Sequence, residues 1–256
     1  MQVVILRSAE EIGQYAADVI LKGVTDGSIS VLGVATGSSP LPVYRALESR
    51  WVPQLAELTV FALDEYVGLP YDHPESYHAV IDREVTRPLR LDPARVHVPD
   101  GSAADPEQAC LDYERRITEA GGIDLQILGI GSSGHIGFNE PTSSLSSRTR
   151  IKTLTPETRR DNARFFPSLD DVPLHCLTQG LGTIMDARRV LLVAQGAGKA
   201  RAVAQAVEGP LSSMCPGSVL QLHPDATILL DEDAASELTL TDYYRFVFEN
   251  RPDWQR

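Results

Sequence analysis

Lysine, cysteine and aromatic residues are scarce in this chain of 256 residues, and no long apolar run occurs. No apolar stretch approaches the roughly 20 residues of a membrane-spanning helix, and the start lacks the cationic leader and long apolar core of a signal peptide. The cysteines, Cys110, Cys176 and Cys215, are odd in number and far apart, which argues against a disulfide framework or a Cys-x-x-Cys metal pair. We therefore expect a cytoplasmic protein with reduced thiols and no membrane partner.

Basic residues are also few, with 23 Lys and Arg against 35 Asp and Glu and a net charge of −12. Without a basic block, the chain is a poor candidate for binding nucleic acid. Hydrophobic residues make up 43% and charged residues 23%, an ordinary globular composition that excludes low-hydrophobicity disorder. The length fits one large or two small domains. No linker-like shift in composition appears, so residues 1–256 are expected to form a single domain.

Short β-branched runs alternate with amphipathic stretches along the chain. Strands are expected at 2–7, 29–34, 58–63, 96–98, 124–130, 189–194 and 226–230, and helices from Ser8 to Gly27 and at 40–50, 77–85, 106–120 and 198–207. This alternation predicts a single three-layer Rossmann-like α/β domain with a mainly parallel sheet and helices on both faces. Ligands of such sheets bind beyond the carboxyl ends of the strands. The loops after Val34, Leu63, Ile130 and Ala194 are therefore the places to look for chemistry.

The loop after Val34 contains Thr36, Gly37, Ser38 and Ser39 and leads into the helix expected at 40–50, with Ser39 as its predicted N-cap. Free N–H groups and the positive dipole end at a helix start can bind an anion, so this loop is a candidate phosphate site. The alternative is that Ser39 only caps the helix and Gly37 only turns the chain. The residues alone leave both open.

Two adjacent carboxylates, Asp64 and Glu65, follow the strand that ends at Leu63. Neighbouring residues of an extended chain point to opposite sides, so one could face a cleft while the other is structural. A partly buried Asp beside another carboxylate can act as a general base. A solvated turn is the alternative, and spacing alone favours it.

The loop after Ile130 contains three glycines around His135, followed by Glu140. Its Gly-x-Gly-x-x-Gly match is a weak dinucleotide signal, because no ribose-binding acid follows where that fold needs one. We interpret His135 as an acid/base group with Glu140 as its orienting partner, against the alternative of a structural histidine. No metal-ligand spacing links His135 to another histidine.

A last group of candidate side chains is cationic. Arg148, Arg150 and Lys152 alternate on an extended segment and share one side. Arg164 lies further on, and Lys199 starts a helix after a strand. Isolated cations are usually solvated, but a chain with only three lysines keeps an ammonium group where a flexible point charge is useful.

At these loops the chain resembles the glucosamine-6-phosphate deaminase family, nearly from end to end. The resemblance is carried by ATGSSP (35–40), LDEYVGL (63–69), HPESY (73–77), GHIGFNEP (134–141), SSRTRIKTL (146–154), NARFF (162–166), VEG (207–209) and LQLHP (220–224). The resemblance implies a Rossmann-like enzyme that converts glucosamine 6-phosphate and water to fructose 6-phosphate and ammonia, without a metal or organic cofactor in the chemistry.

The resemblance also assigns roles to the residues of these motifs. Asp64 matches the base that moves the proton between C2 and C1, His135 the group that opens the pyranose ring, and Glu140 its carboxylate partner. The phosphate-binding positions are matched by Gly37, Ser38, Ser39, Arg164 and Lys199, beside Thr36 in the same loop. Ser133 stands where many members carry an additional ring-opening Asp, so we expect Glu140 to orient His135 alone.

Four further residues, Ser143, Arg150, Lys152 and Thr153, match positions where some members bind N-acetylglucosamine 6-phosphate as an activator. Control of that kind needs a homo-hexamer, which one sequence does not reveal, and surface ion pairing of this segment is the alternative. Two rival functions remain open: a 6-phosphogluconolactonase-like hydrolase, and a sugar-phosphate sensor without turnover. The loop after His135 carries Phe-Asn-Glu-Pro, which is not typical of the lactonases, and the presence of Asp64, His135 and Glu140 together argues against a sensor.

Overall fold

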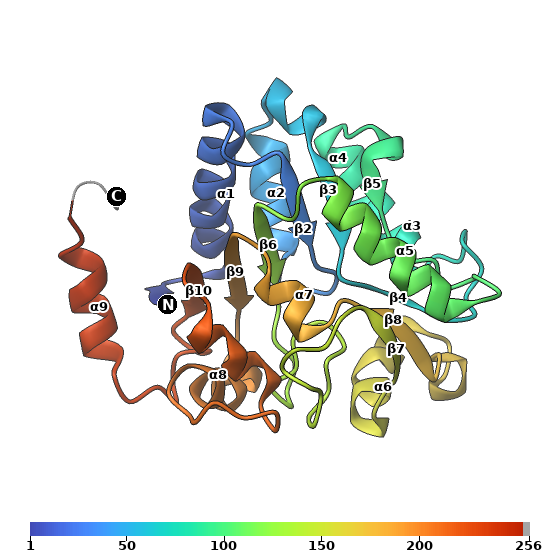
Figure 1. The fold of residues 1–256 in the computed structure, drawn as a ribbon. Coiled ribbons are helices and arrows are strands. Elements are labelled where there is room, and N and C mark those ends of the chain that lie inside the picture. The colour runs from blue at the N-terminus through green and yellow to red at the C-terminus, as the bar shows by residue number, and fades with distance from the viewer. Residues whose placement is uncertain (253–256) are drawn as a thin grey trace.

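The computed structural model describes residues 1–252, which are built around a seven-stranded sheet (Figure 1). Its strands, in spatial order, are β1 (Gln2–Leu6), β10 (Ala226–Asp231), β9 (Arg189–Ala194), β6 (Leu125–Leu128), β2 (Val31–Val34), β3 (Thr59–Ala62) and β5 (Val96–His97). Every neighbouring pair in this sheet is parallel. All carboxyl ends of the strands therefore lie along one edge, as expected of a site for ligands.

Both faces of this sheet are buried under helices. In β9, Val190 and Leu192 belong to one apolar cluster, and Leu191 and Val193 to the other. The cluster that contains Val190 and Leu192 also draws residues from α5 (Pro106–Glu119), α7 (Leu181–Met185) and α8 (Ala200–Val207). The cluster that contains Leu191 and Val193 draws residues from α1 (Ala9–Asp26), α2 (Leu41–Ser49), α3 (Tyr77–Ile81) and α4 (Arg87–Leu89). Because each strand buries alternate side chains against different helices, the three-layer prediction is confirmed.

The signals for the helix ends were right for α1 and wrong for α2. Ser8 caps α1 by accepting a hydrogen bond from the Glu11 N–H at 3.2 Å, and Gly27 ends the helix in the left-handed conformation. For α2, the sequence predicted Ser39 as the cap. The cap residue is instead Pro40, without a side-chain hydrogen bond. The Ser39 hydroxyl is thus not used to cap the helix.

A second, three-stranded antiparallel sheet was not expected. It consists of β4 (Asp64–Tyr66), β8 (His175–Thr178) and β7 (Arg150–Thr153), and it turns the predicted loop after Leu63 into a strand. Within this sheet, Asp64 is paired with Thr178, which is paired in turn with Arg150. The short helix α6 (Pro156–Asn162) follows β7 (Figure 1). This sheet gives Asp64 a fixed backbone instead of a mobile loop.

The last helix, α9 (Thr241–Glu249), was not predicted either. It has no buried residue and stands at the side of the molecule beyond β1 (Figure 1). Its Phe248 ring lies 5.9 Å from that of Tyr15 on α1. Within residues 1–252, no helix is both long and apolar enough to cross a membrane.

Candidate active site

The predicted loops meet at one cavity of about 340 Å³ beyond the carboxyl ends of the central strands. Eight residues predicted from the sequence line it: Thr36, Gly37, Ser38, Ser39, Asp64, His135, Arg164 and Lys199. Ser133 and Glu140 do not line the cavity but contact His135 directly. Residues from five separate segments therefore converge, which local sequence patterns could suggest but not demonstrate.

One wall is the loop between β2 and α2. The Tyr44 hydroxyl, buried under this loop, donates to the Ala35 carbonyl at 2.7 Å and accepts from the Ala35 N–H at 3.1 Å. Gly37 has φ of 91°, a left-handed conformation that favours glycine. The loop is thereby held in a turn that leaves the Ser38 and Ser39 hydroxyls beside the start of α2, a geometry suited to an anion.

Two cations line the same cavity as this loop. Lys199 comes just before α8, and Arg164 lies in the turn that follows α6. Burial lowers the pKa of Lys199; nearby Asp161 opposes this shift, and the charge of Arg164 adds to it. Two like charges brought together in a half-buried place are stabilised by a ligand of opposite charge. A phosphate dianion fits this requirement.

Asp64 and Glu65 point to opposite sides of β4, as the sequence predicted for adjacent residues. Asp64 lines the cavity, and burial together with repulsion from Glu65 raises its pKa well above the usual range. Glu65 instead accepts the backbone N–H groups of Tyr66, Tyr77 and His78, at 2.7, 2.9 and 2.8 Å. Asp64 can therefore accept a proton from a ligand, while Glu65 fixes the start of α3.

His135 lines the same cavity as Asp64 and contacts two oxygen-bearing side chains. Its Nδ1 is 2.8 Å from the Ser133 hydroxyl and 3.4 Å from Oε2 of Glu140. A Cβ on Gly131 would lie 2.1 Å from the imidazole, so only glycine allows this ring position. The expectation that Glu140 alone orients His135 was wrong, because Ser133 lies closer to Nδ1 and also contacts Glu140 at 3.4 Å.

The Glu140 carboxylate remains charged in this setting. Burial would raise its pKa, but the hydrogen bond and charge of His135 and the hydroxyl groups of Thr158 and Thr155 together lower it to about 2. A charged carboxylate can fix the orientation of the imidazole and stabilise its protonated form. His135 can then give and take a proton through Nε2, the ring nitrogen remote from Glu140.

Several residues around the cavity were missed. Tyr77, Phe138 and Asn162 line it, and Thr155 and Thr158 bind Glu140 from outside the cavity. HPESY (73–77) and NARFF (162–166) belong to the motifs that carry the resemblance, but nothing in their spacing indicated which side chains face a ligand. The two threonines precede or begin α6 and are distant in sequence from Glu140, so no local pattern could find them.

The four residues expected at an effector site are not all free for a ligand. Arg150 donates to Oδ1 of Asn139 at 2.8 Å, which ties β7 to the loop that carries His135. The Ser143 hydroxyl is buried without a hydrogen-bond partner, whereas Thr153 is exposed. Lys152 lies two residues from Arg150 on β7, where alternate residues share a side. The neighbouring Arg148 forms ion pairs with Glu114 and Asp186, as the surface alternative predicted for this segment.

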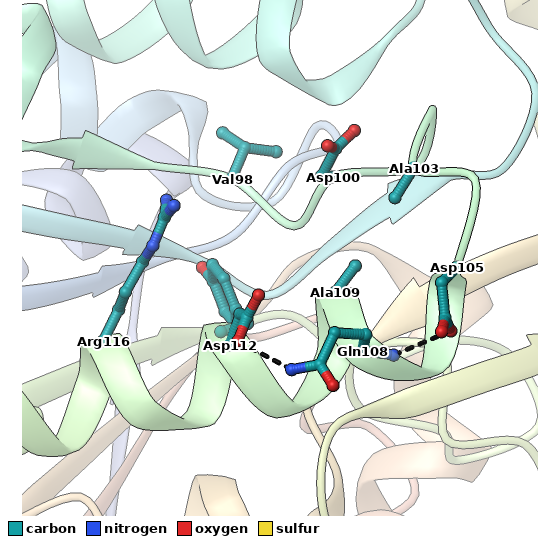
Figure 2. Close-up of a pocket in the computed structure, with 9 residues that line it drawn as sticks. Val98, Asp100, Ala103, Asp105, Gln108, Ala109, Asp112 and Arg116 are labelled. Carbon is teal, nitrogen blue, oxygen red and sulfur yellow. Dashed lines mark hydrogen bonds between the residues drawn. The ribbon is translucent and has the colours of Figure 1, made fainter.

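A second cavity, of about 270 Å³, lies beside α5 and has a different character (Figure 2). There the Gln108 side chain donates to Asp112 at 2.9 Å, and its backbone N–H donates to Asp105 at 3.0 Å. Three of the polar residues of this cavity thus bind one another along the helix. Among residues 1–252, no group of three or more His, Cys, Asp or Glu side chains could hold a metal ion.

Comparison with known proteins links this geometry to a family. Residues 6–229 match the family model of glucosamine-6-phosphate isomerases and 6-phosphogluconolactonases. A glucosamine-6-phosphate deaminase of Pseudarthrobacter chlorophenolicus is 58% identical over 100% of this chain and 99% of its own length. The enzyme of that name from Streptomyces coelicolor is 53% identical, with the same coverage.

Solved structures agree on the fold. A monomeric glucosamine-6-phosphate deaminase superposes with a TM-score of 0.89 at 41% identity, covering 93% of this chain and all of the other. A 6-phosphogluconolactonase from Trypanosoma cruzi superposes with a TM-score of 0.76 at 20% identity, covering 93% of this chain and 97% of its own. At that identity the likeness to the lactonase concerns the fold alone.

Proposed function

The chain belongs to the family of glucosamine-6-phosphate isomerases and 6-phosphogluconolactonases, and from this premise we propose that it is a glucosamine-6-phosphate deaminase. It converts glucosamine 6-phosphate and water to fructose 6-phosphate and ammonia. The observation that carries the proposal is the placement of buried Asp64 and of His135 in one cavity with two cations. The identity to named deaminases over the full length supports deamination above lactone hydrolysis.

The first step in this proposal is opening of the pyranose ring. His135 takes the proton of the C1 hydroxyl and returns one to the ring oxygen, which breaks the bond between C1 and that oxygen. One imidazole can do both near neutral pH. The Ser133 hydroxyl and the Glu140 carboxylate hold the ring in place during this exchange.

The second step moves a proton along the open chain. Asp64 removes the proton from C2 and returns it to C1, while the C1 aldehyde oxygen gains a proton and the amine loses one. The C2 amine thereby becomes an imine, and C1 becomes a hydroxymethyl group. Water then adds to C2, ammonia leaves, and the C2 ketone of fructose 6-phosphate forms. A single carboxylate on one face of the sugar suffices, as in other aldose–ketose isomerisations. Phosphate binding by the 36–39 loop, Lys199 and Arg164 holds the sugar in register for both steps.

The proposal is tested by measuring ammonia release from glucosamine 6-phosphate in parallel with hydrolysis of 6-phosphogluconolactone. We expect ammonia and fructose 6-phosphate in equal amounts, and no lactone hydrolysis above background. Lactone hydrolysis without ammonia would assign the chain to the other branch of its family. Binding of the sugar phosphate with neither activity would identify a sensor. Repeating the assay with N-acetylglucosamine 6-phosphate tests the activator site at Ser143, Arg150, Lys152 and Thr153.

The Lys199→Met variant is expected to weaken substrate binding. Losing one charge-assisted hydrogen bond to the phosphate should raise KM about 10- to 100-fold, with a smaller effect on kcat. The matched control is Lys22→Met, since Lys22 is exposed on α1. Steady-state kinetics should separate the two. Equal KM values for both variants would remove Lys199 from the phosphate site.

Replacing Ser133 with alanine tests its part in holding His135. The hydroxyl itself carries no charge, and its contact with the Glu140 carboxylate is long at 3.4 Å, so its loss should lower kcat by only about 2- to 10-fold. The Glu140→Gln variant, which removes a charge beside the imidazole, should lose more, and Ser133→Asp should keep turnover. A fully active Glu140→Gln enzyme beside an inactive Ser133→Ala enzyme would reverse these roles.

We also propose a cytoplasmic location and a single domain spanning residues 1–256. The three cysteines are buried free thiols, which fits a reducing compartment. The apolar clusters on the two faces of the sheet draw on helices from both halves of the chain, which fits one folding unit.

A further inference from the structure

The two oxygens of the Glu140 carboxylate have different partners. Oε2 faces Nδ1 of His135 and the Ser133 hydroxyl, each at 3.4 Å. Oε1 accepts a hydrogen bond from the Thr155 hydroxyl at 3.2 Å and a shorter one from the Thr158 hydroxyl. Oε2 thus contacts the imidazole, and Oε1 is hydrogen-bonded to the beginning of α6.

The hydroxyls on Oε1 come from a segment that also reaches the substrate cavity. Thr155 is the cap of α6 and accepts the N–H of Thr158 at 3.2 Å, and Thr158 itself is only 5% exposed. At the other end of α6, Asn162 donates to the Tyr66 hydroxyl at 2.9 Å, and Arg164 lines the cavity. This one short segment therefore contacts Glu140 at its start and the predicted phosphate site at its end.

A second contact joins the same two parts of the molecule. The Ser132 hydroxyl, one residue before Ser133, lies 3.3 Å from carboxylate oxygens of both Glu157 and Asp161 on α6. The loop that carries His135 and the helix that leads to Arg164 are thus held together at more than one point. A movement of α6 would change the surroundings of Oε1.

From these contacts we propose that Thr158 is a positioning residue for ring opening, which fixes Oε1 of Glu140 so that Oε2 faces His135. The assignment rests on the proposed function for the step that Thr158 serves. Ser133 gives Nδ1 of His135 a close hydrogen-bond partner without a charge, so the negative charge that faces the imidazole comes from Glu140. Without the Thr158 hydroxyl, the carboxylate rotates or takes up a proton, and in both cases the charge facing His135 is weakened.

The test compares Thr158→Val, which keeps the shape and removes the hydroxyl, with Thr158→Ser, which keeps the hydroxyl. We expect kcat of Thr158→Val to fall about 10- to 100-fold, the range for a hydrogen bond to a charged group, and Thr158→Ser to recover most of it. In a Glu140→Gln background, adding Thr158→Val should lower kcat further by less than about twofold, because both changes remove the same interaction. Fully additive losses would overturn the proposal.

Thr183 provides a matched control elsewhere in the fold. It is 3% exposed, and its hydroxyl donates to Oε1 of Glu114 at 2.5 Å, without lining the substrate cavity. Thr183→Val removes the same kind of bond, so its melting temperature should fall much as in Thr158→Val, while kcat stays unchanged. An equal loss of kcat in both variants would mean that Thr158 acts only through stability.

A measurement without substrate separates this proposal from the proposed function. The imidazole 15N signals of His135 report its tautomer and hydrogen bonding. They should shift in the same direction in Thr158→Val and Glu140→Gln, return in Thr158→Ser, and stay in place in Thr183→Val. Unchanged signals in Thr158→Val would refute the positioning role even in an active enzyme. If the signals shift as expected but the protein releases no ammonia, the positioning role of Thr158 stands and the proposed deaminase activity is wrong.

Discussion

Replacing Asp64 with asparagine should lower kcat by about 10²- to 10⁴-fold, the usual contribution of a general base. The amide keeps the size of the side chain and cannot accept the C2 proton. Because phosphate contacts lie elsewhere in the cavity, KM should change little. Steady-state kinetics of Asp64→Asn, beside Asp72→Asn as an exposed control, measure both constants. An Asp64→Asn enzyme with full kcat would remove this residue from the chemistry.

The same substitution should make the fold more stable at neutral pH. Burial and repulsion from Glu65 raise the pKa of Asp64. From the unfolded value of about 3.9 up to the raised folded value, the folded protein keeps a proton that the unfolded chain releases, and above the folded value it holds an unfavourable charge. Between these two values the folded protein binds more protons than the unfolded protein, so stability falls as the pH rises. The melting temperature of Asp64→Asn should therefore exceed that of the wild type at pH 7–8, and the difference should vanish near pH 4.

The raised pKa also predicts how activity depends on pH. A base must be deprotonated to work, so kcat/KM should fall as the pH drops through the pKa of Asp64, which lies above the ordinary range for an aspartate. A pH profile whose acid limb lies in the ordinary aspartate range would contradict the burial argument. A gain in activity together with a loss of stability in Asp64→Asn would contradict it as well.

The second large effect is expected for His135→Gln. Without the imidazole, ring opening loses its acid/base group, and kcat should fall about 10²- to 10⁴-fold. The variant would then depend on spontaneous ring opening. Its rate should level off with increasing enzyme concentration at the rate of opening measured by NMR without protein. His175→Gln, at an exposed position of β8, is the matched control.

This saturation behaviour distinguishes ring opening from the later steps. If His135 moved the C2 proton instead, the rate of the variant would rise in proportion to enzyme concentration without a plateau. A His135→Gln enzyme that turns over as fast as His175→Gln would exclude both roles.

The large sheet could be predicted because its strands are short apolar runs between turn residues. The expected strand at 189–194 coincides with β9 (Arg189–Ala194), whose alternate side chains are buried on opposite faces. The small sheet was missed because β4 consists of Asp-Glu-Tyr, which gives no apolar pattern. The segment that forms β7 was expected to be extended, but its sequence Arg-Ile-Lys-Thr does not indicate which strand it pairs with. Helix α9 was missed because it has no buried residue and is therefore not a core-facing helix of the kind that an apolar stripe marks.

The candidate site was predictable in its residue types and not in its contacts. The strand ends placed the four loops at one edge, and His135, Asp64 and Lys199 followed from chemistry and resemblance. The N-cap of α2 was mispredicted because Pro40, with its fixed φ, takes that position itself. The contact between Thr158 and Glu140 depends on how α6 packs against the His135 loop, which only the tertiary structure shows.

The central claim is that one carboxylate carries a proton from C2 to C1 within a buried site. It is tested most directly with glucosamine 6-phosphate deuterated at C2, by locating deuterium in the fructose 6-phosphate formed. We expect a reduced rate and deuterium at one of the two C1 positions, because Asp64 has little contact with solvent. Product that carries no deuterium at C1, formed as fast as from the unlabelled sugar, would contradict this claim.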